Sequence, residues 1–152
     1  MKKRPKFTLA QYKDAQIVEL VKKTDKRILA AWAIDCAERV LPYFEERCPK
    51  ENRPRNAIEA LQRWVRTGVF RMAEIRKASL DSHAAAREVG EGPARSAARA
   101  AGQAVATAHV KTHSMGAAIY ALQAIYWATD SEAAVAKERE WQYERLIKLR
   151  KK

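Results

Sequence analysis

Apolar side chains recur at three- and four-residue spacing along most of the chain, which is the period of a helix with one buried face. No segment shows the two-residue alternation of a β-strand. With prolines, glycines and capping residues as boundaries, the pattern predicts helices over about residues 9–23, 25–41, 54–66, 71–89 and 130–150, and two more within 94–128. The sequence therefore predicts an all-α fold: a single-domain compact bundle of about six to seven helices over residues 8–150, after a flexible basic tail at residues 1–7.

The alanine-rich segment from Ala94 to Ala128 is the predicted centre of this bundle. Alanine is the strongest helix former and has no side-chain entropy to lose on folding. Small residues form two neighbouring stripes along the first half of the segment, so other helices can approach closely on both sides. One stripe holds Ala97, Ala101, Ala104 and Ala108, and the other holds Ala98, Gly102, Val105 and His109. Opposite them lie Arg95, Arg99 and Gln103, which are expected to face water.

This segment is too long for one helix. An unbroken helix over residues 94–128 would extend about 52 Å, which exceeds the width of a domain of this size. We therefore expect a break near residues 111–114, with Thr112 or Ser114 as the cap of the second half.

Several residues mark the other helix ends. Thr8 is suited to cap the first helix, and Pro42 should kink or end the second, with residues 43–47 able to add another turn. Gly68 suits the C-terminal cap of the third helix. Thr129, three residues before Glu132, predicts a capping box at the start of the last helix.

Charge is distributed unevenly along the chain. The 152 residues have a net charge of +12, and most of the excess lies at the two ends. Residues 1–28 contain nine Lys or Arg against three Asp or Glu, and residues 137–152 contain seven against three. Basic ends of this kind attract nucleic acid, an anionic membrane or an acidic protein. The alternative is that they only keep the protein solvated.

The sequence contains no membrane span, secretory signal or catalytic motif. No apolar run reaches the roughly 18 residues of a membrane span, and no apolar stretch follows the basic start. Cys36 and Cys48 have no repeated spacing, which predicts free thiols in a cytoplasmic protein. Cys36 lies in the most apolar helix, and nothing near Cys48 would activate it. The sequence predicts a protein that is not an enzyme.

The three histidines are the candidates for a metal site. His109 and His113 are four residues apart and would share a helix face if the helix persists, with a third ligand from His83, Asp35 or Glu38. However, the HEXXH pattern and a cysteine cluster are both absent. We therefore treat the histidines as weak metal candidates and expect no cofactor. The favoured alternative is a structural pair, hydrogen-bonded between helices.

A basic line on the fourth predicted helix is a candidate for binding a partner. Arg76, His83 and Arg87 follow one flank of this helix. Guanidinium groups bind carboxylates and phosphates through two parallel hydrogen bonds, so the line could form an anion pocket or dock an acidic partner. The alternative is internal pairing, for example with Asp35 or Glu59 on neighbouring helices.

Trp141 is the second candidate for partner binding. It lies in the charged last helix, and tryptophan is over-represented at protein interfaces. The alternative is that it packs beneath that helix. Trp32 and Trp64, by contrast, lie on apolar helix faces and are predicted to be core residues.

Five segments taken in order carry a resemblance to a known family. They are AAWAIDCAERVLPYFEERCP (Ala30–Pro49), RPRNAIEALQRWVRTG (Arg53–Gly68), HAAARE (His83–Glu88), ARAAGQAVATAHVKTHSMGAA (Ala98–Ala118) and EREWQYERL (Glu138–Leu146). Over about residues 28–146, the set resembles a family of small bacterial helical proteins, the putative immunity proteins of the immunity-five-like type. The resemblance implies an all-α cytoplasmic protein that neutralises a toxin of a polymorphic toxin system, with no catalytic residues to carry over.

The charge of the chain bears on the partner that this resemblance implies. Nuclease inhibitors are often acidic because they cover a basic cleft, whereas this chain is strongly basic. An inhibitor with this charge would use a local acidic patch or bind an acidic toxin. The alternative function is non-specific nucleic-acid binding through the basic termini. The alanine-rich face also leaves a homodimer open.

Overall fold

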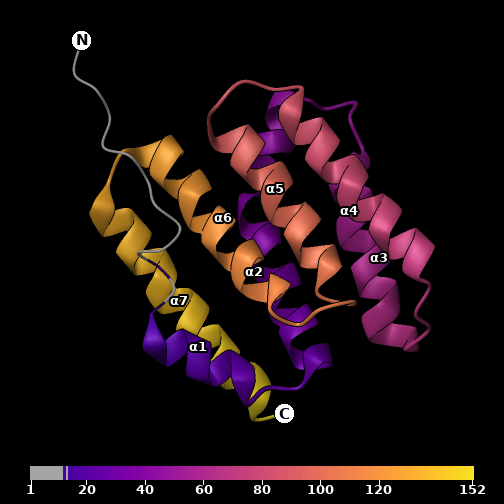
Figure 1. The fold of residues 1–152 in the computed structure, drawn as a ribbon. Coiled ribbons are helices and arrows are strands. Elements are labelled where there is room, and N and C mark those ends of the chain that lie inside the picture. Colours follow the sequence, from indigo (N-terminus) through magenta and orange to yellow (C-terminus); the bar gives the residue numbers. More distant parts are fainter. Residues whose placement is uncertain (1–11, 13) are drawn as a thin grey trace.

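The computed structural model describes residue 12 and residues 14–152, which form seven helices (Figure 1). In chain order these are α1 (Ala15–Lys22), α2 (Lys26–Arg47), α3 (Arg53–Thr67), α4 (Met72–Arg87), α5 (Pro93–Ala106), α6 (His113–Thr129) and α7 (Glu132–Arg150). This part of the chain contains no strand, so the all-α prediction is confirmed. The predicted tail at residues 1–7 and the predicted cap Thr8 lie outside the described residues.

Helix α5 is the centre of the bundle. It packs against α2, α3, α4 and α6 (Figure 1). Both stripes of small residues are buried except for His109, which lies beyond the end of the helix and is exposed. The absence of long side chains is what allows four helices to approach one another around α5. The prediction that the alanine-rich segment is central is confirmed.

The polar side of α5 does not face water as predicted. Arg95, Arg99 and Gln103 are all half-buried and bonded to neighbouring helices. The Arg95 side chain, for example, donates to the carbonyl oxygen of Val89 over 2.8 Å. The prediction was wrong because a helix surrounded by four others has little solvent-facing surface, so its polar side chains satisfy their hydrogen bonds on adjacent helices.

The predicted break in the alanine-rich segment is confirmed. Helix α5 ends at Ala106 and α6 begins at His113, with Thr112 in the capping position. The Thr112 side chain makes no capping hydrogen bond, whereas Ser114 Oγ donates to the Lys111 carbonyl over 2.7 Å.

The predicted start of the first helix and the predicted end of the second helix differ from the structure. Helix α1 begins only at Ala15, where the Asp14 carboxylate caps it by accepting from the Ile17 amide over 3.0 Å. Helix α2 does not end at Pro42 but continues to Arg47. Proline removes one intrahelical donor, but Leu41 and Phe44 on either side are buried in the core. Their packing stabilises the last turns beyond the lost hydrogen bond.

At the last boundary, the cap is Ser131 and not Thr129. Ser131 Oγ accepts from the Ala134 amide over 3.1 Å. Thr129 is still the last residue of α6, and its hydroxyl donates to the Ile125 carbonyl over 2.7 Å. The capping-box prediction was wrong because the preceding helix extends through the threonine. At Gly68, by contrast, the predicted C-cap is confirmed, with φ of 72° and an amide that donates to the Trp64 carbonyl.

Helix α7 is held against α2 and α6 by buried hydrogen bonds. The indole of Trp32 donates to the Gln142 carbonyl over 2.8 Å, and the buried Gln142 amide donates to the Ala118 carbonyl over the same distance. Trp32 and Trp64 are both buried, as predicted. No helix of the described chain combines the length and apolarity needed to cross a membrane.

Candidate functional site

Five large apolar side chains are exposed in the described part of the chain, and they belong to the α3–α4 connection, helix α4 and the α5–α6 connection. We call them the apolar patch. Their exposed fractions are 40–58%, and they are Val69, Phe70, Met72, Leu80 and Val110. The first two lie in the α3–α4 connection and the last in the α5–α6 connection. Figure 1 shows these two connections at the same end of the molecule.

Ring contacts join the two connections. The Phe70 ring is stacked on the His109 ring with centroids 6.3 Å apart and planes inclined by 6°. The Lys26 ammonium lies 5.9 Å from the Phe70 centroid and 5.4 Å from that of Trp64, within the range of cation–π attraction. The patch is therefore a continuous surface built by the α3–α4 connection with α4 and by the α5–α6 connection, with Lys26 of α2 at its edge.

Local sequence explains why these side chains remain outside. The left-handed Gly68 ends α3, and Arg71 occupies the N-cap position of α4 three residues later. The Val69 amide donates to the Thr67 hydroxyl over 3.2 Å, which fixes the tight connection close to the helix end. In so short a connection the side chains of Val69 and Phe70 have no route into the core, although both are strongly apolar.

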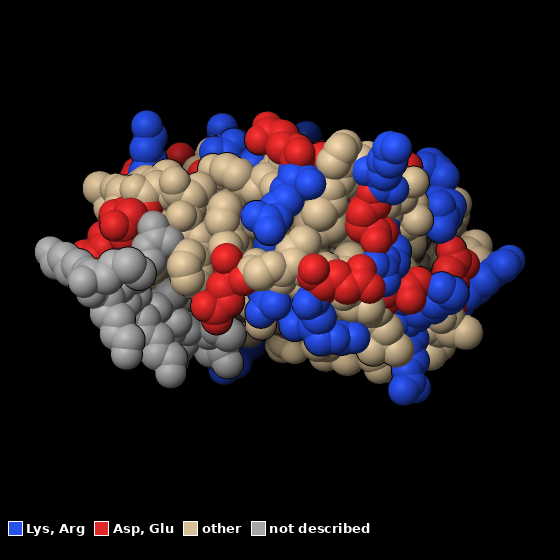
Figure 2. Space-filling model, turned by 90° about the horizontal axis from the view of Figure 1, so that it is seen from above, with Lys and Arg blue, Asp and Glu red and all other residues tan. Residues whose placement is uncertain are grey.

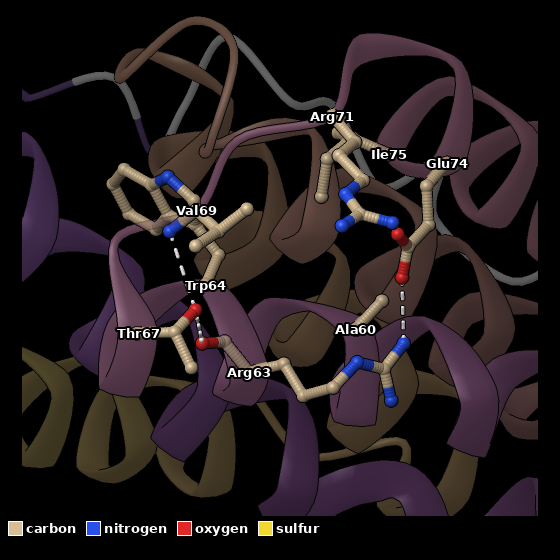
Figure 3. Close-up of a pocket in the computed structure, with 8 residues that line it drawn as sticks. All are labelled: Ala60, Arg63, Trp64, Thr67, Val69, Arg71, Glu74 and Ile75. Carbon is tan, nitrogen blue, oxygen red and sulfur yellow. Dashed lines mark hydrogen bonds and ion pairs between the residues drawn. The ribbon is translucent and has the colours of Figure 1, made fainter.

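A first groove lies beside the patch between α3 and α4, and we call it the Trp64 groove. It has a volume of about 430 Å³. Figure 3 shows Trp64 and Val69 on one side of it, and Arg71 with Glu74 on the other. The residues that complete the lining are Ala60, Arg63, Thr67 and Ile75.

A second groove lies on the other side of Ile75, and we call it the His109 groove. Its volume is about 330 Å³. Helix α4 provides one wall, and the end of α5 and start of α6 provide the other. Its lining consists of Met72, Ile75, Arg76, Ser79, Leu80, Ala106, His109 and His113. Since Ile75 belongs to both linings, the two grooves are neighbours along the apolar patch.

The groove linings carry more positive than negative charge. They contain Arg63, Arg71 and Arg76 but a single carboxylate, Glu74. The Arg63 guanidinium binds that carboxylate over 2.8 Å (Figure 3). Arg71 and Arg76 are exposed and form no ion pair within the described residues. One unpaired guanidinium therefore stands at each groove, a combination of apolar surface and positive charge suited to an acidic protein surface.

The predicted basic line is split by the structure. Arg76 lines the His109 groove, His83 is half-buried against α5, and Arg87 is exposed near the end of α4. The alternative of pairing with Asp35 or Glu59 is wrong for Asp35, which binds Arg145 over 2.7 Å, and no pairing of the line with Glu59 occurs. The three residues of the basic line do not form one site, because α4 packs on both α3 and α5 and each of the three has different neighbours.

Trp141 lies apart from the patch. Helix α7 packs on α2 and α6, whereas the patch is built by α3, α4 and the α5–α6 connection. The Trp141 ring is half-buried, and the Arg39 guanidinium lies 3.9 Å above its centroid. The same guanidinium binds Glu138 over 2.6 Å. One face of the predicted interface anchor is thus occupied within the molecule.

The histidines do not converge on a metal site. His109 and His113 are separated by the break between α5 and α6, so the condition under which they would share a helix face is not met. The His113 ring bonds the Gln103 side chain over 2.8 Å, and burial, followed by the charge of His109, lowers the pKa of His113. Within the described residues, no group of three His, Cys, Asp or Glu is arranged to hold a metal ion.

His83 is held in the neutral state by burial and by the neighbouring Arg99. The guanidinium lies 2.9 Å from Nδ1 of the imidazole, and because arginine can only donate, Nδ1 must accept. Burial, and then the positive charges of Arg99 and Arg87, lower the pKa of His83 to about 4. The ring thus serves as a packed, uncharged acceptor between α4 and α5.

This environment predicts a pH-dependent stability. The unfolded state binds a proton at His83 below about pH 6.5, whereas the folded state resists it down to about pH 4. The free energy of unfolding should therefore fall as the pH is lowered from 7 to 5, by about 1 kcal/mol after allowance for solvent screening. Urea denaturation at the two pH values measures the fall. In His83→Gln, the new side-chain amide oxygen can accept from Arg99 but does not titrate. The fall in the free energy of unfolding should then be smaller, because only the lowered pKa of His113 still contributes to it. An unchanged fall would contradict the assignment.

The cysteines offer no activated nucleophile. Cys36 is fully buried in α2, as predicted, and Cys48 is half-buried after the end of that helix. Burial, reinforced by the charge of Asp35, raises the pKa of the Cys36 thiol well above its usual value. The reactive thiolate form is therefore disfavoured at this position.

Comparison with protein families accounts for nearly all of the chain. The model of the Imm-5 like putative immunity protein family matches residues 19–149, which include the apolar patch and both grooves. The chain belongs to this family. The resemblance stated from the sequence is thereby confirmed, and the immunity family indicates a non-catalytic role. A search of curated proteins and a search of solved structures found no match.

In this immunity-family protein, sequence reasoning identified Arg76 and the histidines beside the grooves but missed the apolar patch. Two signals for it are present. Val69 and Phe70 directly follow the glycine that ends a helix, where apolar residues are not needed for the turn. Met72, Arg76 and Leu80 form a second stripe on α4, four residues apart and separate from the stripe that enters the core.

Proposed function

We propose that this protein neutralises a bacterial toxin by binding it stoichiometrically, and that the toxin docks on the apolar patch and its two grooves. One observation carries the proposal. The large apolar side chains that the described chain exposes line two neighbouring hollows or lie beside residues that line them, instead of being scattered over the surface. Contiguous exposed apolar surface next to polar residues is typical of protein–protein interaction sites.

The residue types of the surface support this function. Aromatic residues, methionine and arginine are enriched at protein interfaces, and buried anchors in pockets contribute most of the binding energy. Phe70, Met72, Arg71 and Arg76 are of these types and lie on or beside the grooves. Neutralisation by binding requires no reaction, which agrees with the non-catalytic role that the family indicates.

The distribution of charge favours a protein partner over nucleic acid. On the face drawn in Figure 2, basic and acidic side chains are interspersed and form no single positive field. In the basic last helix, Arg139 binds Asp14 and Arg145 binds Asp35. These pairs reduce the positive charge that α7 has available for phosphates. Non-specific nucleic-acid binding depends on such contacts between basic side chains and phosphates.

Capture of the toxin tests the proposal. The tagged protein is used to isolate partners from a nuclease-treated lysate of its own host, at low and at high salt. We expect one protein at near-equal stoichiometry under both conditions. That protein is then expressed in another bacterium, where it should stop growth, and co-expression of the immunity protein should restore it. Partners that vanish with nuclease, or a captured protein whose toxicity is not relieved, would contradict the proposal.

A further inference from the structure

We infer that the apolar patch accepts an acidic amphipathic segment of a partner protein, whose apolar side chains enter the two grooves while its carboxylates bind Arg71 and Arg76. The inference rests on the proposed function and specifies the chemistry of the toxin surface. It is carried by the juxtaposition of two hollows, a continuous apolar surface and two spare guanidinium groups.

Two guanidinium groups without a carboxylate partner lie at the grooves. Some arginines outside the grooves are neutralised by carboxylates: Arg53 binds Glu51 over 2.7 Å, and Arg55 binds Glu45 over 2.8 Å. Arg145 is paired in the same way between α7 and α2. Other exposed arginines, such as Arg47 and Arg87, have no ion pair among the described residues but line no groove. Arg71 and Arg76 also have no such partner, but both occupy positions in groove linings.

The geometry sets where apolar groups and carboxylates of the partner must lie. Ile75 is buried and forms the floor shared by the grooves, so an occupant has to cross the first turns of α4 to reach both. Arg71 stands at the start of α4 beside one groove, and Arg76 lies five residues further along beside the other. A segment that places one apolar side chain in each hollow therefore brings its flanking residues close to both guanidinium groups.

The charge of the surface excludes two occupants from this chain itself. Residues 1–13 contain five Lys or Arg and no Asp or Glu, so the N-terminal segment is repelled by the arginines. A second copy joined by two-fold symmetry would bring the same positive groups towards each other across the interface. A flat anionic membrane could meet the charge, but it would leave two hollows unfilled. An acidic amphipathic protein segment satisfies both features.

Selection from a random peptide library tests the inference with a defined probe. Library peptides that bind the intact protein are selected, and their affinities are measured by titration. We expect the selected peptides to combine Leu, Phe or Trp with flanking Asp or Glu. Arg71→Glu/Arg76→Glu should lower their affinity by about 10- to 100-fold. The matched control Arg47→Glu/Arg87→Glu, which reverses two exposed arginines outside the grooves, should leave it unchanged.

The outcomes separate this inference from the proposed function. Peptides without acidic residues, or equal affinity for both charge-reversal variants, would overturn the inference. Binding of the wild type but not Arg71→Glu/Arg76→Glu to phosphatidylserine vesicles, with no peptide selected, would also overturn it in favour of a membrane. In each case restoration of growth in the presence of the toxin would still support neutralisation. Suppose that the selected peptides are acidic and require Arg71 and Arg76, but the protein fails to relieve toxicity. The inference about the apolar patch would then stand, and the proposed toxin neutralisation would be rejected.

Discussion

Replacement of Gly102 by leucine is expected to lower the free energy of unfolding by about 3 kcal/mol, as overpacking of a close-packed core does. Even a Cβ atom at this position would lie 2.7 Å from Nε2 and 2.9 Å from Cδ2 of the His83 ring. The ring cannot readily move away, because Arg99 binds its other nitrogen and α4 lies directly against α5. A leucine side chain must therefore push the two helices apart at the centre of the bundle.

Thermal or urea unfolding measures this effect. A loss of about 3 kcal/mol corresponds to a decrease in Tm of roughly 6–12 °C for a chain of this length. Gly90→Leu is the matched control, since a Cβ there has nothing within 4 Å and its stability should change by less than about 0.5 kcal/mol. The double variant His83→Ala/Gly102→Leu should recover at least about 1 kcal/mol of the expected sum of the single losses. If Gly102→Leu unfolds like the control, the close approach of α4 and α5 is not what stabilises the bundle.

The central position of α5 was predictable because the required information is local. A run of alanines with one glycine can be helical and closely packed whatever surrounds it. What could not be predicted was that Arg95, Arg99 and Gln103 are half-buried and bonded to neighbouring helices. Periodicity places them opposite the small residues, but only the number of helices around α5 decides whether that side is solvent. Pro42 is a similar case, because the local preference for a helix end is outweighed by packing on both sides of it.

The candidate site was less predictable than the fold for a related reason. Amphipathic patterns assign apolar residues to the core and do not identify those that fail to reach it. Phe70 and Leu80 are as apolar as their buried neighbours, and only the joint geometry of the α3–α4 and α5–α6 connections leaves them outside together. The basic line is divided for a different reason. Arg76 and Arg87 are about 16 Å apart along one helix, which is too far for two ends of a line to serve one small pocket.

The most direct test of the patch is Leu80→Glu, which is expected to weaken toxin binding by about 100-fold or more, as loss of an interface anchor does. Leu80 is 56% exposed and lines the His109 groove. A glutamate there removes the apolar side chain and adds a charge that an acidic partner repels. It also lies four residues after Arg76, where it can bind that guanidinium along the helix and withdraw it from the partner.

Stability and binding must be separated for this variant. Because Leu80 is exposed and glutamate is a good helix former, the free energy of unfolding should change by less than about 0.5 kcal/mol. Ala73→Glu introduces the same charge at an exposed position of the same helix that lines neither groove, and it should bind the toxin like the wild type. Titration calorimetry with the captured toxin, together with growth in its presence, compares the two variants. A Leu80→Glu protein that is folded and still protects as well as Ala73→Glu would show that the toxin docks elsewhere. Loss of protection by Leu80→Glu alone would place the contact on the stripe that Met72, Arg76 and Leu80 share, because both variants add a carboxylate to α4 but only Leu80→Glu removes a side chain of the apolar patch.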